Sequence, residues 1–84
     1  MRIRFTKHAK EKFILMRQSG FPVLRKEVVQ TIKTPVKIEE RTDGTSIVTS
    51  IYDPTHVLRV VYRIENAIII VITFYPGRRK AYEV

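Results

Sequence analysis

The sequence predicts an α+β domain in which two N-terminal helices pack on one face of a twisted, mainly antiparallel sheet, in the order β-α-α-β-β-β-β. Three observations predict this class. Apolar residues in the first third recur at helical spacing, segments beyond residue 36 alternate apolar and polar side chains between short turns, and residues 67–74 are almost all Ile and Val. Because 84 residues is the size of one domain, we expect a single domain over residues 1–84.

The composition indicates a folded and strongly basic protein. Hydrophobic residues make up 44% of the chain, and 16 Lys and Arg against 8 Asp and Glu give a net charge of +8. This excess favours a polyanionic partner, above all nucleic acid, over an acidic protein partner or a purely solubilising role. The chain has no Cys, which excludes disulfides and thiolate chemistry and fits a reducing compartment.

The first two elements are a short strand and a helix. Apolar residues alternate with two arginines in residues 1–5, which predicts the strand. Thr6 is a suitable N-cap for a helix over residues 7–19, because its hydroxyl can accept a free N–H of the first turn. Gly20 is a suitable stop, since glycine adopts the left-handed conformation without a Cβ penalty. The expected buried stripe of this helix is Ala9, Phe13 and Met16.

A second, shorter helix is predicted over residues 24–33, before Pro35, which cannot continue a helix. Each helix has one apolar stripe, so each must pack on another element, and the pair is expected to cover one face of the sheet. The expected stripe of the second helix is Leu24, Val28 and Ile32.

Asp43-Gly44 predicts a two-residue hairpin turn between strands 36–41 and 45–53, because both central positions of such a turn need a positive φ. In that register, the side chains expected on one face are Val36, Ile38, Ile47, Thr49 and Ile51.

The last hairpin, with strands 57–64 and 67–74, is predicted to be the centre of the sheet. A two-residue turn at Glu65-Asn66 would set the second strand's isoleucines beside Arg59 and Arg63, whereas a three-residue turn over 65–67 sets them beside apolar residues. Burial should therefore select the three-residue turn. The apolar face is then expected to hold Leu58, Val60, Tyr62 and Ile64 beside Ile68, Ile70, Ile72 and Phe74. The opposite face is expected to carry Arg59, Arg63, Thr73 and Tyr75, with Val57, Val61, Ile69 and Val71 between them.

Basic and aromatic residues concentrate on this opposite face and in the tail after it. Metal-free cleavage of RNA requires a base for the 2′-hydroxyl proton, an acid for the leaving oxygen, and cations at the phosphate. Arginine suits the last role because it binds phosphate oxygens with two donors, and aromatic rings can also stack on bases. The candidates are Arg59, Arg63, Tyr75, Arg78, Arg79 and Tyr82, with His8 as a further acid or base.

Each candidate also has a structural interpretation. The strand arginines can be solvated positions of an outer sheet face, and Tyr75 can be a packing residue that caps the sheet. Residues 78–80 can be a charged tail without function. His8 can be a capping or packing residue, and His56 is expected to be a loop residue where a strand begins.

The sequence argues against metal-dependent and nucleophilic catalysis, so we expect no metal and no cofactor. The chain has only two His, and Glu39 and Glu40, as neighbours on a strand, should point to opposite faces. No Ser or Thr lies in a nucleophile elbow, and the three Gly form no phosphate loop. The N-terminal residues lack a signal-peptide core and no apolar run can span a bilayer, so a cytoplasmic protein without a membrane partner is expected.

Residues 5–9 (Phe-Thr-Lys-His-Ala), the helix ending at Pro35, the strand 57–62 (Val-Leu-Arg-Val-Val-Tyr) and the segment 72–76 (Ile-Thr-Phe-Tyr-Pro) resemble an uncharacterised family of small bacterial and archaeal proteins. That family is similar to the RelE/ParE toxin superfamily. The resemblance covers almost the whole chain and implies a RelE-like arrangement. RelE-type members are toxins that cleave mRNA, mostly in the ribosome, without a metal, whereas ParE-type members act on gyrase.

The resemblance also implies roles for individual residues. Arg59 would be the strand arginine of a RelE-type site, and Arg78 the basic residue beyond the last strand. Tyr82 would be the C-terminal tyrosine, with Tyr75 as a second candidate, and a BrnT-like branch with a histidine in the first helix region adds weight to His8. The further residues expected to bind nucleic acid are Arg63, Arg79 and Lys80, with Arg25 and Lys26 toward ribosomal RNA.

These observations give two main functional hypotheses. The first is the toxin-like component of a type II toxin–antitoxin system, a metal-independent mRNA endoribonuclease that acts on RNA on the ribosome and is bound by an acidic antitoxin protein. The alternative is a non-catalytic RNA- or protein-binding module, either a ParE-like inhibitor or a degenerate toxin. RNA cleavage on expression would distinguish them.

Overall fold

The computed structural model describes residues 2–84, so Met1 of the expected first strand lies outside the described residues. The chain forms a five-stranded sheet in the order β1-β5-β4-β3-β2, with two α-helices. The elements are β1 (Arg2–Phe5), α1 (Lys7–Gln18), α2 (Arg25–Lys33), β2 (Lys37–Glu40), β3 (Thr45–Ile51), β4 (His56–Glu65), β5 (Ile68–Arg78) and a 3₁₀ turn η1 (Arg79–Tyr82). The α+β class and the element order are confirmed, and the sheet is mixed because only β1 pairs in parallel, with β5.

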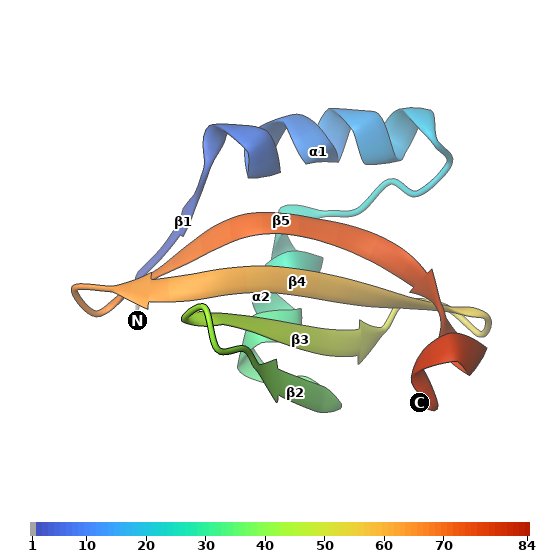
Figure 1. Cartoon of the computed structure of the whole chain (residues 1–84). Coiled ribbons are helices and arrows are strands. Elements are labelled where there is room, and N and C mark those ends of the chain that lie inside the picture. The colour runs from blue at the N-terminus through green and yellow to red at the C-terminus, as the bar shows by residue number, and fades with distance from the viewer. Residues whose placement is uncertain (1) are drawn as a thin grey trace.

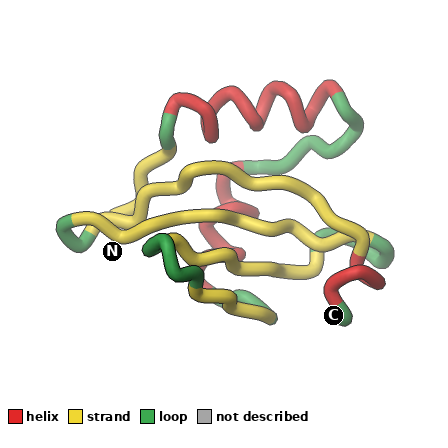
Figure 2. The backbone as a smooth tube through the Cα atoms, in the orientation of Figure 1, coloured by secondary structure: helices red, strands yellow, loops and turns green. Residues whose placement is uncertain are grey.

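The helices lie toward one side of the sheet. Figure 1 shows α1 alongside β5 and α2 crossing behind β4 and β3, so the other face of the strands remains in view. In Figure 2, β4 and β5 run the length of the molecule, with their connecting turn at one end and η1 at the other. The long central hairpin therefore positions everything on the uncovered face.

Helix α1 forms as predicted. The Thr6 hydroxyl accepts the backbone N–H of Ala9 at 3.1 Å, which caps the first turn. Gly20 has φ +87°, the left-handed conformation that ends the helix at little cost. Ala9 and Met16 are buried and Phe13 packs against the core, so the predicted stripe is confirmed.

The predicted stripe of α2 is only partly right. Val28 is buried and Ile32 packs against the core, but Leu24 is 51% exposed because it precedes the helix as its N-cap residue. The carboxylate of Glu27 accepts the N–H of Leu24 at 2.8 Å. Buried Thr31 makes the inward polar contact, with its hydroxyl 2.6 Å from that of Ser50.

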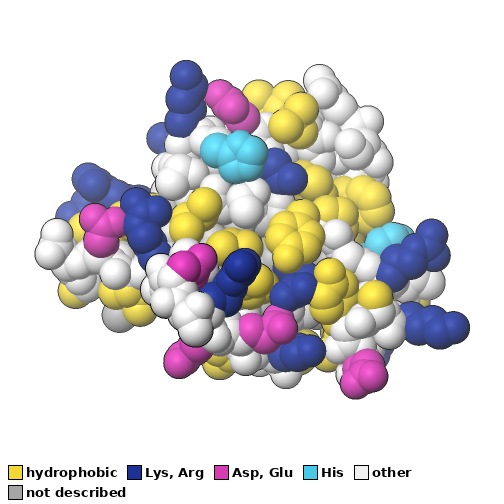
Figure 3. Space-filling view, viewed as in Figure 1, with side chains coloured by type: hydrophobic (Ala, Val, Ile, Leu, Met, Phe, Trp, Pro, Cys, Tyr) yellow, Lys and Arg dark blue, Asp and Glu magenta, His cyan; other side chains and the backbone are white. Residues whose placement is uncertain are grey.

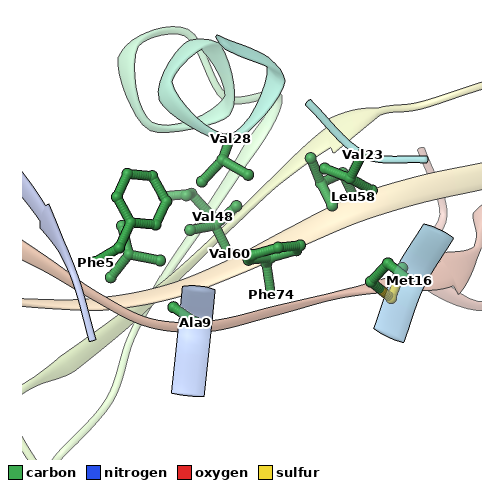
Figure 4. Packing of buried hydrophobic residues seen from close by; sticks show 10 residues of the cluster. Phe5, Ala9, Met16, Val23, Val28, Val48, Leu58, Val60 and Phe74 are labelled. Atoms are coloured by element: carbon green, nitrogen blue, oxygen red, sulfur yellow. The ribbon is translucent and has the colours of Figure 1, made fainter. Parts of the chain in front are cut away.

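The hydrophobic core lies between the helices and the sheet. Figure 4 shows Phe74 of β5 next to Val60 of β4, with Val28 reaching in from α2 and Phe5 from β1. Phe74, Val60 and Val28 are each 0% exposed. Phe13 connects the aromatic side chains, with its ring centroid 4.6 Å from that of Phe74 and 5.6 Å from that of Phe5.

The predicted register of the first hairpin is wrong. Arg41 donates its N–H to the carbonyl of Thr45 at 2.9 Å, so the connection has three residues and only Gly44, at φ +86°, is left-handed. Ile38 consequently pairs with Val48 and faces the helix side. The side chains of Lys37 and Glu39 lie on the other face, with Ile47, Thr49 and Ile51.

The predicted turn of the second hairpin is also wrong. Two residues, Asn66 at φ 50° and Ala67 at φ 62°, form the turn. Both values are positive, as a two-residue turn that follows the strand twist requires. Ile69 and Val71 therefore share the helix-side face near the turn, where Ile68 and Ile70 were expected. A β-bulge then shifts the register by one residue between Val61/Thr73 and Tyr62/Val71.

Candidate nucleic-acid interface

We call the sheet face opposite α2 the open face, and its side chains considered below are Lys37, Glu39, Thr49, Arg59, Arg63, Thr73 and Tyr75. Strand alternation places these side chains together. Figure 3 views this face and shows acidic, basic and apolar side chains intermixed over the strands.

The β-bulge determines which side chains of β5 reach the open face. Ile72 is the extra residue of β5 relative to β4. Without it, the register set by the turn would place Phe74 opposite Arg59 and turn Tyr75 toward the core. The carbonyl of Ile72 accepts the hydroxyl of Thr6 at 3.1 Å, so the N-cap of α1 also holds the bulge in place. The predicted position of Tyr75 on the same face as Arg59 is confirmed, although the bulge produces it.

Arg59 lies at the centre of the open face between two tyrosine rings. Its guanidinium carbon is 4.2 Å from the ring centroid of Tyr82 and 5.7 Å from that of Tyr75. A terminal nitrogen of Arg59 forms an ion pair of 2.5 Å with Glu39. Only 7% of Arg59 is exposed, so these contacts lie largely out of water. The pair with Glu39 leaves the centre of the face with little net charge.

The C-terminal residues bring Tyr82 over the sheet. Arg79 donates its backbone N–H to the carbonyl of Thr55 at 2.9 Å, which holds η1 against the β3–β4 turn. Its side-chain Nε–H donates to the backbone oxygen of Val84 at 2.5 Å and closes the C-terminal segment on itself. The Tyr82 ring lies directly on Gly77, where an added Cβ would be 2.4 Å from the ring's Cε2. Only glycine fits beneath the ring, so Gly77 permits the contact between Tyr82 and Arg59.

His8 borders the open face next to Thr73. It occupies the first turn of α1 and is exposed, and its Nε2 lies 3.2 Å from the Thr73 hydroxyl. An imidazole can take up or release a proton near neutral pH. The structure therefore brings the predicted acid–base candidate to the edge of the face that carries Tyr75.

Arg63 also lies on the open face, one alternate position beyond Val61. Its Nε–H donates to the carboxylate of Glu65 at 2.6 Å. Both side chains are about half exposed, at 43% and 54%, so water and salt screen this pair strongly. Arg63 is thus more available to a polyanion than Arg59.

The structure does not bring Arg78 to the same face as Arg59. Arg78 pairs with His56 across the strands, and alternation directs both toward the helix side at the end of the sheet. Arg25 and Lys26 begin α2, on the covered side, and the guanidinium of Arg25 lies 4.6 Å from the ring centroid of Phe5. Their expected roles in binding ribosomal RNA stay predictions.

A basic rim, defined as Arg78, Arg79 and Lys80, borders the end of the sheet. These three residues line a hollow of about 530 Å³ together with Pro54, Thr55 and Val84. None of these lining side chains is acidic, so the three cations give the lining of the hollow an excess of positive side chains. Because η1 connects this rim with Tyr82, the rim and the open face are continuous along the chain.

The sequence did not single out Asp53 and His56 as a pair. The Asp53 carboxylate lies 3.0 Å from His56 Nδ1 and accepts the backbone N–H groups of Thr55 and His56. Desolvation raises the pKa of Asp53, but hydrogen bonds from Thr55 and His56 outweigh it and hold that pKa below its ordinary value. The Phe21 ring lies edge-on to the imidazole at 4.9 Å. An aspartate shortly before a strand is a known turn signal, and it could have predicted this arrangement.

Glu39 and Gly77 were also missed as parts of the interface. The sequence indicated Glu39 only as a possible metal ligand beside Glu40, and the mispredicted register of the first hairpin hid its approach to Arg59. Gly77 followed Pro76 and looked like part of an ordinary chain exit. A glycine within a strand is itself a signal that another group approaches closely.

Within residues 2–84, no group of three or more His, Asp or Glu side chains is arranged to hold a metal ion. The same part of the chain contains no helix long and apolar enough to cross a membrane. Comparison of the chain with protein-family models, curated proteins and solved structures finds no match.

Proposed function

We propose that this protein is the toxin-like component of a type II toxin–antitoxin pair and a metal-independent mRNA endoribonuclease that binds RNA across the open face and the basic rim. The observation that supports this most is Arg59 near the rings of Tyr75 and Tyr82, together with three cations that line a hollow where the C-terminal turn carrying Tyr82 begins. Aromatic rings beside a positive groove suit single-stranded RNA, whose bases stack while its phosphates meet Lys and Arg.

The proposed reaction is attack of the RNA 2′-oxygen on the adjacent phosphorus. The new P–O bond forms as the bond to the 5′-oxygen breaks, giving a 2′,3′-cyclic phosphate and a 5′-hydroxyl. One group removes the 2′-hydroxyl proton and another protonates the leaving oxygen. His8 is the candidate for one of these transfers, since it is exposed beside Thr73, and Tyr75 is the candidate for the other. The cations Arg63 and Arg78 contact the phosphates on either side of the one that is cleaved.

One observation favours the second candidate function, a non-catalytic RNA-binding module. Arg59 is 7% exposed and its charge is balanced by Glu39, so it offers the phosphate no free guanidinium in this arrangement. A binding module needs only flanking cations and rings for stacking. Such a module would bind RNA with an affinity that falls steeply with salt and would leave the RNA intact.

The partner that fits the toxin proposal is an acidic antitoxin protein. The net charge of +8 favours rapid association with a negatively charged chain. The antitoxin would cover the open face and the rim, and so keep RNA away from them.

Induced expression in a bacterial host tests the proposal, with growth and RNA integrity followed together. The test variant is His8→Ala/Arg78→Ala, chosen because both side chains are exposed and their removal should leave the fold intact. The matched control is Lys33→Ala, an exposed cation at the end of α2.

We expect growth arrest with fragmented RNA for the wild type and Lys33→Ala, and loss of both effects for the double variant. Arrest with intact RNA would overturn the ribonuclease proposal in favour of a protein target. Soluble wild-type protein without arrest would overturn it in favour of the binding module.

A further inference from the structure

We propose that the open face contains a nucleobase-binding pocket that the chain's own Tyr82 closes in this structure, and that a base of the bound RNA takes the place of the Tyr82 ring. This inference rests on the proposed RNA binding and specifies which groups would meet a base.

Two buried polar atoms of the open face have no hydrogen-bond partner, and one of them belongs to Arg59, which the Tyr82 ring contacts. Among the described residues, Arg59 Nε and Thr49 Oγ1 are the buried side-chain nitrogen and oxygen atoms without a hydrogen-bond partner. Arg59 and Thr49 are directly opposite each other on β4 and β3, and they are 7% and 0% exposed. Buried polar groups are rarely left without partners, because each costs free energy. Arg59, whose guanidinium the Tyr82 ring contacts, therefore keeps an unused hydrogen-bond donor in this closed arrangement.

The site of the Tyr82 ring has the shape that a flat aromatic ligand requires. The ring lies 4.2 Å from the guanidinium carbon of Arg59 and rests on the bare backbone of Gly77, where a Cβ would come within 2.4 Å. Tyr75 borders the site, 5.7 Å from the same guanidinium carbon. If Tyr82 moves away, it leaves a space of the size of an aromatic ring between the Arg59 guanidinium and the backbone of Gly77.

The charge of the site selects a base rather than a phosphate. Glu39 pairs with Arg59, so the floor carries little net positive charge and presents a carboxylate that repels phosphate. A nucleobase is a neutral flat ring that can stack on the Arg59 guanidinium as the Tyr82 ring does, and the donors on its edge suit the Glu39 carboxylate. The phosphates then lie at the basic rim, where no acidic side chain lines the hollow.

The closing segment is suited to opening. Tyr82 belongs to a 3₁₀ turn of four residues that contains no buried residue. A main-chain hydrogen bond, from the N–H of Arg79 to the carbonyl of Thr55, links this turn to the β3–β4 turn. Terminal segments with few buried contacts open locally at small free-energy cost. The base therefore competes only with a short docked turn.

A tryptophan at position 82 would report the exchange directly, because the chain has no other Trp. We expect the emission of Tyr82→Trp to shift to longer wavelength, saturably, on addition of adenosine or guanosine 5′-monophosphate, as the indole ring moves into water. Ribose 5-phosphate, which has the phosphate but no base, should leave the emission unchanged. The matched control is Tyr52→Trp on the helix side, where no nucleotide should change the emission.

The direction in which Tyr82→Ala changes the affinity for mononucleotides provides a second test. If Tyr82 closes the pocket, its removal should raise the affinity for the mononucleotides about threefold or more, since the competing state is lost. Weaker binding by Tyr82→Ala, an equal shift with ribose 5-phosphate, or no shift in a protein that cleaves RNA would overturn the inference. A clear shift in a protein that leaves RNA intact would support the pocket and overturn only the nuclease proposal.

Discussion

Gly77→Ala should destabilise the protein through Tyr82 alone. Gly77 does not have a positive φ, so alanine brings no backbone strain, but its Cβ would lie 2.4 Å from the Tyr82 ring. The ring and η1 must then move off the sheet, which loses the cation–π contact with Arg59 and its surrounding packing. Because a terminal turn can leave without disturbing the core, we expect a loss of only about 1–2 kcal/mol in the free energy of unfolding.

The effect of Gly77→Ala on the free energy of unfolding should change sign when the Tyr82 ring is already absent. In a Tyr82→Ala background the Cβ meets no ring, and alanine in place of glycine restricts the unfolded chain, which stabilises by about 0.5 kcal/mol. A double-mutant cycle by urea unfolding should therefore give a coupling of about 2 kcal/mol between positions 77 and 82.

The control for this cycle is Gly44→Ala. Gly44 has φ +86° and its Cβ would meet nothing within 4 Å, so alanine there costs backbone strain of about 1 kcal/mol whether or not Tyr82 is present. If Gly77→Ala destabilised equally in both backgrounds, the packing of Tyr82 on Gly77 would be refuted, and with it the closed pocket.

Four further predictions test the fold and the interface. Ala67→Gly should raise the unfolding free energy by about 1 kcal/mol, because Ala67 is held at φ 62° in the turn, and urea unfolding would show a higher midpoint. Thr6→Ala should lower the unfolding free energy by about 1–2 kcal/mol in the same assay, since the Thr6 hydroxyl both caps α1 and donates to the carbonyl of the bulge residue Ile72. Because hydrogen bonds from Thr55 and His56 lower the pKa of Asp53, its carboxylate stabilises the fold above the ordinary pKa of about 3.9, and this contribution disappears as the pH falls through the lowered pKa. Thermal unfolding between about pH 5 and 2 should thus show a smaller acid sensitivity for Asp53→Asn than for the wild type. Glu39→Gln should lower stability by about 1 kcal/mol at low salt while raising the affinity for RNA phosphates, and unchanged RNA affinity would show that Arg59 stays inaccessible.

Periodicity predicted the helices and strands because each has a local cause. Thr6 caps α1 through its own side chain, Gly20 ends it by its own φ, and the Ile and Val run of β5 has the side chains of a strand, of which Ile69 and Val71 are buried. Such features depend on residues within one or two turns of each other, so the sequence contains them.

The strand registers could not be predicted in the same way. Asn66-Ala67 forms a two-residue turn, one position beyond the Glu65-Asn66 turn that burial argued against, and the bulge at Ile72 returns Phe74 to the core. This compensation depends on Thr6, which lies 66 residues away and bonds the bulge carbonyl. A local pattern does not reveal a partner so distant in the sequence.

In the interface, too, the features with a local cause could be predicted and those that depend on distant residues could not. Tyr75 and Arg59 reach one face as predicted, because residues at alternate positions of a strand share a side. The meeting of Arg59 with Tyr82 and Glu39 depends on a tail and on an edge strand whose positions only the tertiary structure settles. Arg78 was expected beside Arg59. Its partner on β4 is His56, three positions from Arg59, so strand alternation directs Arg78 to the opposite side.

The most direct test of the proposed function is cleavage of a labelled single-stranded mRNA by the purified protein in EDTA, with and without translating ribosomes, followed by analysis of the product ends. The proposal predicts fragments with 2′,3′-cyclic phosphate and 5′-hydroxyl ends in at least one of these reactions, and their loss with His8→Ala/Arg78→Ala. Intact RNA in both reactions, or fragments with 5′-phosphate ends, would contradict it.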